Sequence, residues 1–404
     1  DIDESGSGDL RGGDIGIATA AARALAEPVA AHLGLRGGVL ATDTGGTNLR
    51  GSAKAEAIAA RADGRPWVYY GDSRADLEVW ARADEAVAVG PSPAVRRALA
   101  RMDLPIRTID SARPSPVRRW TSALRVHQWV KNVLVLVPVL ASHLVLDPTV
   151  LTRSVLAAVA FCAMASSIYL LNDLIDLDAD RAHPSKRHRA LAAGWVPIPA
   201  ALVASGALAL VAVAIATWLG LAFVGVILVY AAATTLYSAW IKRKIVADVV
   251  GLAMLYTWRI LAGCVAAMVV PSIWMLAFST FLFLSLGVMK RYAEIVNHGR
   301  SAAGRDYHEV DAPLLLAIGS SSGIAAVLVA VLYLDSPQVN ALYSFPEALW
   351  AVIPLLVYWI VRFWMVAARG GVDDDPIVFA LTDRTSLIVL ALIGGAAGIA
   401  MLAP

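Results

Sequence analysis

A cluster of aspartates follows a long apolar run in the stretch NDLIDLDADRAHPSKRHR, residues 172–189. Asp173, Asp176 and Asp180 recur at positions i, i+3 and i+7, so on a helix they share one face, with Asn172 beside them. Three like charges on one stripe repel one another unless a cation lies among them. Oxygen ligands of this kind suit Mg²⁺, which keeps several waters and bridges to substrate phosphates. The stripe therefore predicts a magnesium site.

Basic residues follow the aspartates within the same stretch, at Arg181, Lys186 and Arg189. Magnesium together with cations is the combination that binds a diphosphate, because both neutralise phosphate oxygens. The alternative is a solvated acidic helix end that these three cations only neutralise. We favour the diphosphate clamp, because the cluster stands where an apolar run ends and where unneeded charge is costly.

Apolar runs long enough to cross a bilayer occupy the chain from Val130 onward. The chain is 58% hydrophobic and 16% charged, with a mean hydropathy of +0.64, as is typical of membrane proteins. We therefore predict a mostly α-helical, polytopic membrane protein with nine transmembrane helices. The predicted spans are 130–146, 152–172, 199–218, 221–240, 248–268, 272–289, 313–334, 348–368 and 385–403.

The basic residues between these spans fall on one side only. The segment before the first span and every second loop carry them, whereas the other connections hold a single basic residue, Arg153. By the positive-inside rule, the N-terminus and the basic loops are predicted to be cytoplasmic and the C-terminus external. This pattern predicts a multi-pass protein of a bacterial-type inner membrane, with its active site at the cytoplasmic face.

Two ionisable residues, Asp248 and Arg259, fall within one predicted span. An unpaired arginine inside a span costs about 2.5–3.5 kcal/mol, so Arg259 needs a partner. Asp248 lies eleven residues earlier, three helical turns away and on a similar face. We predict that Asp248 is that partner.

The aspartate cluster resembles the first aspartate motif, NDxxDxxxD, of the UbiA superfamily of membrane prenyltransferases. In that family the motif binds Mg²⁺ and the diphosphate of a polyprenyl donor. The resemblance implies a UbiA-like fold in which Asp173 and Asp176 are catalytic. The implied metal ligands are Asn172, Asp173, Asp176 and Asp180.

The family's second motif is a pair of aspartates four residues apart. This chain has Asp248, which the resemblance implies as a further catalytic residue, but Leu252 stands four residues later. The details look more like one branch, the polyprenyl-phosphate (decaprenyl-phosphate) phosphoribosyltransferases, although Ala190 replaces the proline usual there. The similar stretches are RVHQWVKN (125–132), NDLIDLDADRAHPSKRHR (172–189), YSAWIKRKIVAD (237–248), RILAG (259–263), KRYAE (290–294) and FALTDR (379–384).

This resemblance implies a reaction in which a polyprenyl phosphate attacks the anomeric carbon of phosphoribosyl pyrophosphate and expels pyrophosphate, with Mg²⁺ as cofactor. Mg²⁺ and cations stabilise the leaving diphosphate while an oxocarbenium-like centre develops. Lys131 is implied to hold the lipid phosphate. The other implied substrate contacts are Lys186, Arg189, Tyr237, Lys242, Arg259, Lys290, Arg291 and Glu294.

Plainer roles are open for several of these residues. Lys131 is alternatively an interfacial anchor, Lys242 a determinant of topology, and Lys290 the partner of Glu294 in a helix-end ion pair. For the whole protein, the alternative enzyme is a prenyltransferase that moves a polyprenyl group from its diphosphate to an aromatic acceptor such as 4-hydroxybenzoate. A non-enzymatic transporter or scaffold is a third class. We expect the lipid bilayer but no nucleic acid as a partner, and a homo-oligomer stays open.

The first 110 residues differ in composition, because they carry charge throughout and contain no run that could span a bilayer. Short apolar strands alternate there with helical stretches, which predicts a cytoplasmic, soluble α/β domain with a parallel sheet. Residues 111–127, rich in Pro, Ser and Arg, are the predicted linker to a transferase domain over 128–404.

Three fragments of this N-terminal part resemble the haloacid dehalogenase-like phosphatase family. The resemblance implies that Thr19 binds phosphate, that Lys54 steadies a phosphoaspartate and that Asp72 and Asp76 hold Mg²⁺. The family's nucleophile belongs to a DxD at a strand end, whereas the DID at residues 1–3 has no strand before it. Covalent catalysis needs its nucleophile. We therefore expect a partial domain with a vestigial site and no phosphatase activity.

Overall fold

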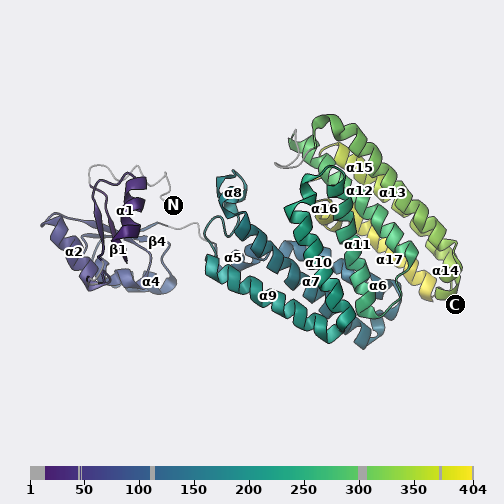
Figure 1. The fold of residues 1–404 in the computed structure, drawn as a ribbon, viewed down its shortest axis with the longest axis horizontal. Coiled ribbons are helices and arrows are strands. Elements are labelled where there is room, and N and C mark those ends of the chain that lie inside the picture. Colours follow the sequence, from purple (N-terminus) through teal and green to yellow (C-terminus); the bar gives the residue numbers. More distant parts are fainter. Residues whose placement is uncertain are drawn as a thin grey trace. The chain divides into compact units, whose positions relative to one another are not determined.

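The computed structural model describes residues 14–43, 46, 48–109, 114–298, 307–372 and 375–402. The chain divides into two compact units, one from Asp1 to Pro114 and one from Ser115 to Pro404. Figure 1 shows strands flanked by helices in the first unit and long helices lying side by side in the second.

Two small parallel sheets form the N-terminal unit. One pairs β1 (Ile17–Ala22) with β2 (Val39–Thr42), and the other has the order β3 (Val68–Gly71), β4 (Glu85–Val89), β5 (Ile106–Ile109). The connecting helices are α1 (Arg23–His32), α2 (Ser52–Ala62), α3 (Leu77–Trp80) and α4 (Pro93–Leu99). Trp80 is fully buried against Ala86 and Ala88 of β4, so the apolar strand supplies the core. The predicted α/β class with parallel strands is confirmed.

Helices make up nearly all of the second unit. It begins with α5 (Pro116–Ala123), the tight 3₁₀ segment η3 (Val126–Leu136), α6 (Val137–Ala141) and η4 (Leu144–Leu146). Next come α7 (Pro148–Ile175), α8 (Leu177–Ala182), η5 (Lys186–His188), α9 (Ile198–Leu219), α10 (Leu221–Ala239), η6 (Ile241–Arg243), α11 (Ala247–Ala267) and α12 (Ile273–His298). The remainder is η7 (Glu309–Asp311), α13 (Ala312–Leu334), α14 (Pro337–Leu342), η8 (Pro346–Ala351), α15 (Val352–Ala368), α16 (Pro376–Thr382) and α17 (Arg384–Leu402).

Eight helices of the described residues are long and apolar enough to cross a membrane, and they coincide with the second to ninth predicted spans. The mostly helical, multi-pass class is confirmed. The segment predicted as the first span, 130–146, is divided among η3, α6 and η4, and the apolar helix there is shorter, Val126–Ala141. Pro138 in the first turn of α6 has no backbone N–H to continue the hydrogen bonds of a preceding helix, and the φ of 59° at His143 ends the helical run after α6.

The centre of this unit is built on α7 and α11, whose apolar windows are 61% and 56% buried, against 17% for α9 and α17. The segment η3 packs tightly on α11 at Gly263. A Cβ atom at this glycine would lie 2.2 Å from the carbonyl oxygen of Val135, so only glycine allows the approach. The contact holds the polar residues of η3 against the polar residues of α11.

Candidate active site

The aspartate stripe lies where α7 ends and α8 begins. Asp173 is on the last turn of α7, Asp176 separates the two helices, and Asp180 is on α8. The side chains of Asp173 and Asp180 are buried, at 5% and 3% exposure, whereas Asp176 is exposed. The helical stripe is thus interrupted at Asp176, and two of its three carboxylates are withdrawn from solvent.

Two arginines neutralise the buried carboxylates. Nη1 of Arg189 lies 2.6 Å from Asp180 Oδ2 and 3.3 Å from Asp173 Oδ1, so it bridges the two side chains. Arg125, at the start of η3, also donates to Asp173 Oδ1, and its guanidinium lies over the Tyr169 ring. In the sequence, neutralisation of the aspartates by Arg189 was an open alternative to the diphosphate clamp. The structure shows that Arg189 does contact two of these aspartates.

The site holds carboxylate oxygens of the kind that Mg²⁺ binds, and those of Asp173 and Asp180 are paired with arginines. Among the described residues, no three His, Cys, Asp or Glu side chains converge as a metal site. Mg²⁺ in phosphate-binding enzymes takes one or two carboxylates and completes its shell with waters and substrate phosphates. Asp173, Asp176 and Asp180 offer that donor set, and Asn172 lies beside them with its amide 3.4 Å from Ser238 Oγ. A diphosphate would supply the remaining ligands.

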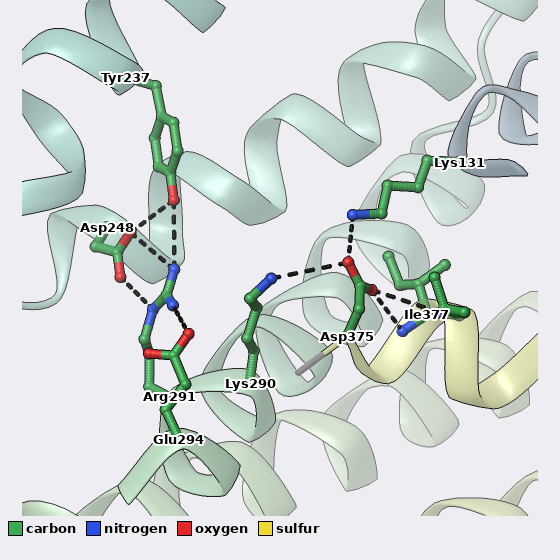
Figure 2. Close-up of polar contacts among 9 residues, drawn as sticks. Lys131, Tyr237, Asp248, Lys290, Arg291, Glu294, Asp375 and Ile377 are labelled. Atoms are coloured by element: carbon green, nitrogen blue, oxygen red, sulfur yellow. Dashed lines mark hydrogen bonds and ion pairs between the residues drawn. The ribbon is translucent and has the colours of Figure 1, made fainter. Parts of the chain in front are cut away.

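A second buried network joins α10, α11 and α12 (Figure 2). The Asp248 side chain is fully buried and accepts from Arg291 twice, with Nε at 2.5 Å and Nη2 at 3.2 Å. The hydroxyl of Tyr237 donates to Asp248 Oδ1 at 2.7 Å. Glu294, one turn along α12, accepts from Arg291 Nη1 at 2.6 Å. One buried guanidinium is thus shared by two carboxylates.

The predicted pairing of Arg259 with Asp248 is wrong. Eleven residues advance an α-helix by about 16 Å, which is beyond the combined reach of the two side chains. Arg259 is 6% exposed and donates to Asn132 Oδ1 at 2.9 Å, Tyr230 Oη at 3.0 Å and the Leu255 carbonyl at 2.7 Å. In the described part of the chain, all of its hydrogen-bond partners are therefore uncharged.

A third group lies beside the second network and brings together η3, α12 and the start of α16 (Figure 2). Lys131 Nζ donates to Asp375 Oδ2, and Lys290 Nζ lies 3.7 Å from the same oxygen. The sequence left open an ion pair of Lys290 with Glu294; in the structure Lys290 lies against Asp375, and Glu294 accepts from Arg291. Burial raises the pKa of Asp375, but the two lysines outweigh it, and the pKa lies below its ordinary value.

The remaining predicted contacts lie in the loops around these groups. Lys186 begins η5 and Lys242 is in η6, and both are half-buried. Their roles as substrate contacts stay predictions.

Asp375 and Arg125 are polar partners that sequence reasoning missed. Asp375 precedes Pro376, a pattern typical of a helix start, and its Oδ1 does cap α16 by accepting from Ile377 N at 3.1 Å. No local signal indicates that its other oxygen contacts Lys131, 244 residues earlier. Arg125 is the first residue of RVHQWVKN (125–132), one of the stretches similar to the family, but its contact with Asp173 depends on the tertiary fold.

The N-terminal unit has a smaller polar site around Asp76. Lys54 of α2 lies 3.1 Å from Tyr69 Oη, which donates to Asp76 Oδ1 at 3.0 Å. Asp76 Oδ2 accepts from the Ser73 amide and hydroxyl at 3.0 and 2.7 Å. Burial raises the pKa of Asp76, but the bonds from Ser73 and Tyr69 and the charge of Lys54 outweigh it, leaving the pKa below its ordinary value.

The other residues predicted for this site are spread around it. Asp72 is exposed, and its backbone N–H lies 3.3 Å from Asp76 Oδ2. Thr19 is on β1 and accepts from the Ala21 amide at 3.1 Å. The DID at residues 1–3 lies outside the described residues, so the question of its nucleophile stays where the sequence left it.

Two protein families match the chain. Residues 133–401 match the UbiA prenyltransferase family, and residues 10–80 match the haloacid dehalogenase-like hydrolases. In fold, the chain is similar to a UbiA homologue from Archaeoglobus fulgidus bound to GPP and Mg²⁺, with a TM-score of 0.53, 16% identity, and coverage of 69% of this chain and 99% of that one.

Three bacterial relatives are more similar in sequence. The protein y4nM of Sinorhizobium fredii is 36% identical over 391 residues, which cover 95% of this chain and 75% of that protein. The nodulation protein NoeC of Azorhizobium caulinodans is 34% identical, with coverage of 71% and 94%. The decaprenyl-phosphate phosphoribosyltransferase of Mycolicibacterium smegmatis is 35% identical, with coverage of 67% and 89%.

Proposed function

The chain belongs to the UbiA prenyltransferase family, and we propose that within this family it is a phosphoribosyltransferase. It transfers the 5-phosphoribosyl group of phosphoribosyl pyrophosphate to a polyprenyl phosphate of the decaprenyl type and releases pyrophosphate. The Mycolicibacterium smegmatis relative, a decaprenyl-phosphate phosphoribosyltransferase by name, supports this choice of substrates.

The observation that carries the proposal is a set of buried cations separate from the aspartates. Arg125 and Arg189 already neutralise the aspartate site, yet Lys131, Lys290 and Arg259 are withdrawn from solvent elsewhere in the same unit. Prenyl transfer to an aromatic acceptor handles one diphosphate. Phosphoribosyl transfer handles a diphosphate, a 5-phosphate and a lipid phosphate, and so needs cations at more than one place.

The arrangement around Asp248 also favours this reaction over prenyl transfer. Its carboxylate is held by Arg291 and Tyr237, and Leu252, where a second aspartate would stand, packs against the apolar core. We propose that Asp248 positions Arg291, and through it the end of α12, instead of holding a second metal ion. Arg291 and Glu294 would then shape the site from behind Lys290 without contacting the substrate.

The proposed step is a single displacement at the anomeric carbon. An oxygen of the lipid phosphate forms a bond to this carbon, while the bond from the carbon to the pyrophosphate oxygen breaks and its electron pair leaves with pyrophosphate. The attacking oxygen is already anionic, so no base is required. Arg125 and Arg189 lie beside the aspartates, where the leaving pyrophosphate would bind. Mg²⁺ bound at Asp173, Asp176 and Asp180 would supply further positive charge there.

We also propose that this site lies at the cytoplasmic face of a bacterial-type inner membrane. The loops that carry the aspartates and most of the basic residues support that orientation. Phosphoribosyl pyrophosphate is soluble, so it would reach the site from that side while the lipid stays in the bilayer.

Purified protein tests the proposal against its main alternative. Polyprenyl phosphate, Mg²⁺ and labelled phosphoribosyl pyrophosphate should yield a labelled lipid, whereas a polyprenyl diphosphate with 4-hydroxybenzoate should yield no prenylated product. The opposite pair of results would identify a prenyltransferase. If the protein turns over neither pair of substrates, the proposed function is contradicted.

A further inference from the structure

Three distant segments bring Lys131, Lys290 and Asp375 together at one carboxylate oxygen (Figure 2). Oδ1 of Asp375 is engaged by the backbone amides of Ile377 and Val378, at 3.1 and 3.4 Å. Its Oδ2 is therefore left to serve both lysines. The three side chains are mostly withdrawn from solvent, with exposures of 10% for Lys131, 24% for Lys290 and 15% for Asp375.

The charges at this point do not cancel. Arg259 joins the group across the Tyr256 ring, because the Lys131 amine and the Arg259 guanidinium lie 6.0 and 5.4 Å from its centroid. Two lysines therefore share one carboxylate, with the Arg259 guanidinium nearby, and these four side chains sum to a net charge of +2. The neighbouring group of Arg291 with two carboxylates reduces the total to +1. Uncompensated buried charge is costly, so an anion would stabilise this arrangement.

We propose that Lys131 and Lys290 form one receptor for a single phosphate monoester, and that Asp375 occupies this receptor as an internal counter-ion when no ligand is bound. A phosphate oxygen takes the place of Asp375 Oδ2 between the two amines, while Oδ1 stays on the α16 amides. A monoester carries a charge of about −1.5 to −2 at neutral pH, which is opposite in sign to the local surplus of +1 to +2 and similar to it in size. The inference rests on the proposed function, which supplies two monoesters, the lipid phosphate and the 5-phosphate of the donor.

The decisive variant is Asp375→Asn, because asparagine also caps a helix but carries no charge. The chain offers a close control in Asp147, which likewise precedes a proline and caps α7 by accepting from the amides of Thr149 and Val150. Asp147 is exposed and caps the N-terminus of α7, whereas the aspartate site lies at the C-terminus of the same helix. Asp147→Asn therefore makes the same chemical change without touching the lysines.

Equilibrium binding to the full chain in detergent, without turnover, measures the effect. The probes are farnesyl phosphate for the lipid source, ribose 5-phosphate for the soluble source and inorganic pyrophosphate as the comparison. Asp375→Asn should tighten the binding of one monoester about tenfold, because its competing charge is gone, and should lower the thermal stability of the unliganded protein. Asp147→Asn should change neither, and pyrophosphate should bind all three proteins alike. The monoester whose affinity changes in Asp375→Asn shows whether the receptor binds the lipid phosphate or the 5-phosphate of the soluble donor.

Lys131→Gln and Lys290→Gln complete the test, and each should weaken binding of the same monoester about tenfold or more. If the two variants affect different monoesters, the lysines serve separate sites and the proposal fails. It also fails if Asp375→Asn leaves both monoester affinities unchanged or weakens them, as a purely structural role would, or if the wild type binds neither monoester. Because binding is read without turnover, an enzyme with other substrates would contradict only the proposed function.

Discussion

Arg291 holds the fully buried carboxylate of Asp248 through two nitrogen atoms, at 2.5 and 3.2 Å, across the interface of α12 and α11. Both side chains are essentially inaccessible, so neither can exchange its partner for water. The pair therefore joins two membrane helices at the level where their polar residues gather, and removing Arg291 takes away the cation that is paired with the buried Asp248 carboxylate.

Arg291→Ala should reduce the free energy of unfolding by about 3–5 kcal/mol, the cost of orphaning a buried charge. Replacing both members, Asp248→Leu with Arg291→Met, should cost less, since no unpaired charge remains at Asp248. Thermal unfolding in detergent measures both losses. If Arg291→Ala is as stable as the double variant, Asp248 must find another partner when Arg291 is removed.

Arg153 at the other end of the bundle offers a purely structural comparison. Its guanidinium donates to the carbonyls of Ala266 and Leu219 at 2.9 and 2.8 Å, and so binds the last turns of α11 and α9. Arg153→Gln should lower the free energy of unfolding by about 1–3 kcal/mol, because two carbonyls lose their donors. The transferase rate of the folded protein should stay within twofold of wild type, by the order of effect expected away from a site. A larger loss of rate would connect this end to catalysis.

Asp173→Asn should reduce the transferase rate by about a hundredfold or more, as loss of a group that stabilises a leaving anion does elsewhere. It should also abolish the stabilisation by Mg²⁺ with pyrophosphate, which for a saturating ligand at a hundred times its Kd amounts to about 2.7 kcal/mol. Thermal shift of wild type and variant measures this. If the wild type shows neither transferase activity nor this stabilisation, the aspartate site is a neutralised helix end and the transporter or scaffold class gains support.

The N-terminal unit should show a pH-dependent stability that comes from Asp76. Its pKa in the folded protein lies below the ordinary value of 3.8, so its charged form stabilises the fold above that value, and this stabilisation is lost as the pH falls through the folded pKa. Asp76→Asn should therefore speed hydrogen exchange in β3 and α3 at neutral pH, with the difference from wild type shrinking below about pH 4. A difference that stays constant with pH would assign the effect to lost hydrogen bonds alone.

The sequence predicted the elements well and the partners poorly. Helix spans follow from length and hydropathy, so eight predicted spans coincide with long helices, whereas Pro138 and the turn at His143 shorten the apolar segment before them. The cluster at Asp173 was visible because its residues are neighbours in the chain. Contacts between distant segments carry no such signal.

Arg259 illustrates the limit. Its position within a predicted span correctly indicated that it needs partners, but the spacing along its own helix pointed to Asp248. The true partners, Asn132 and Tyr230, come from η3 and α10, which only the packed fold brings near. Asp375 was missed for the same reason, since its cap on α16 is local but its contact with Lys131 is not.

The central claim is tested most directly by a doubly labelled donor. Phosphoribosyl pyrophosphate carrying ¹⁴C in the ribose and ³²P in the β-phosphate is incubated with the protein, Mg²⁺ and decaprenyl phosphate, and the lipid is extracted. A phosphoribosyltransferase should leave ¹⁴C in the lipid and ³²P in free pyrophosphate, and both signals should be lost with Asp173→Asn. Lipid without ¹⁴C, under conditions in which the protein is folded and binds Mg²⁺ with pyrophosphate, would contradict it.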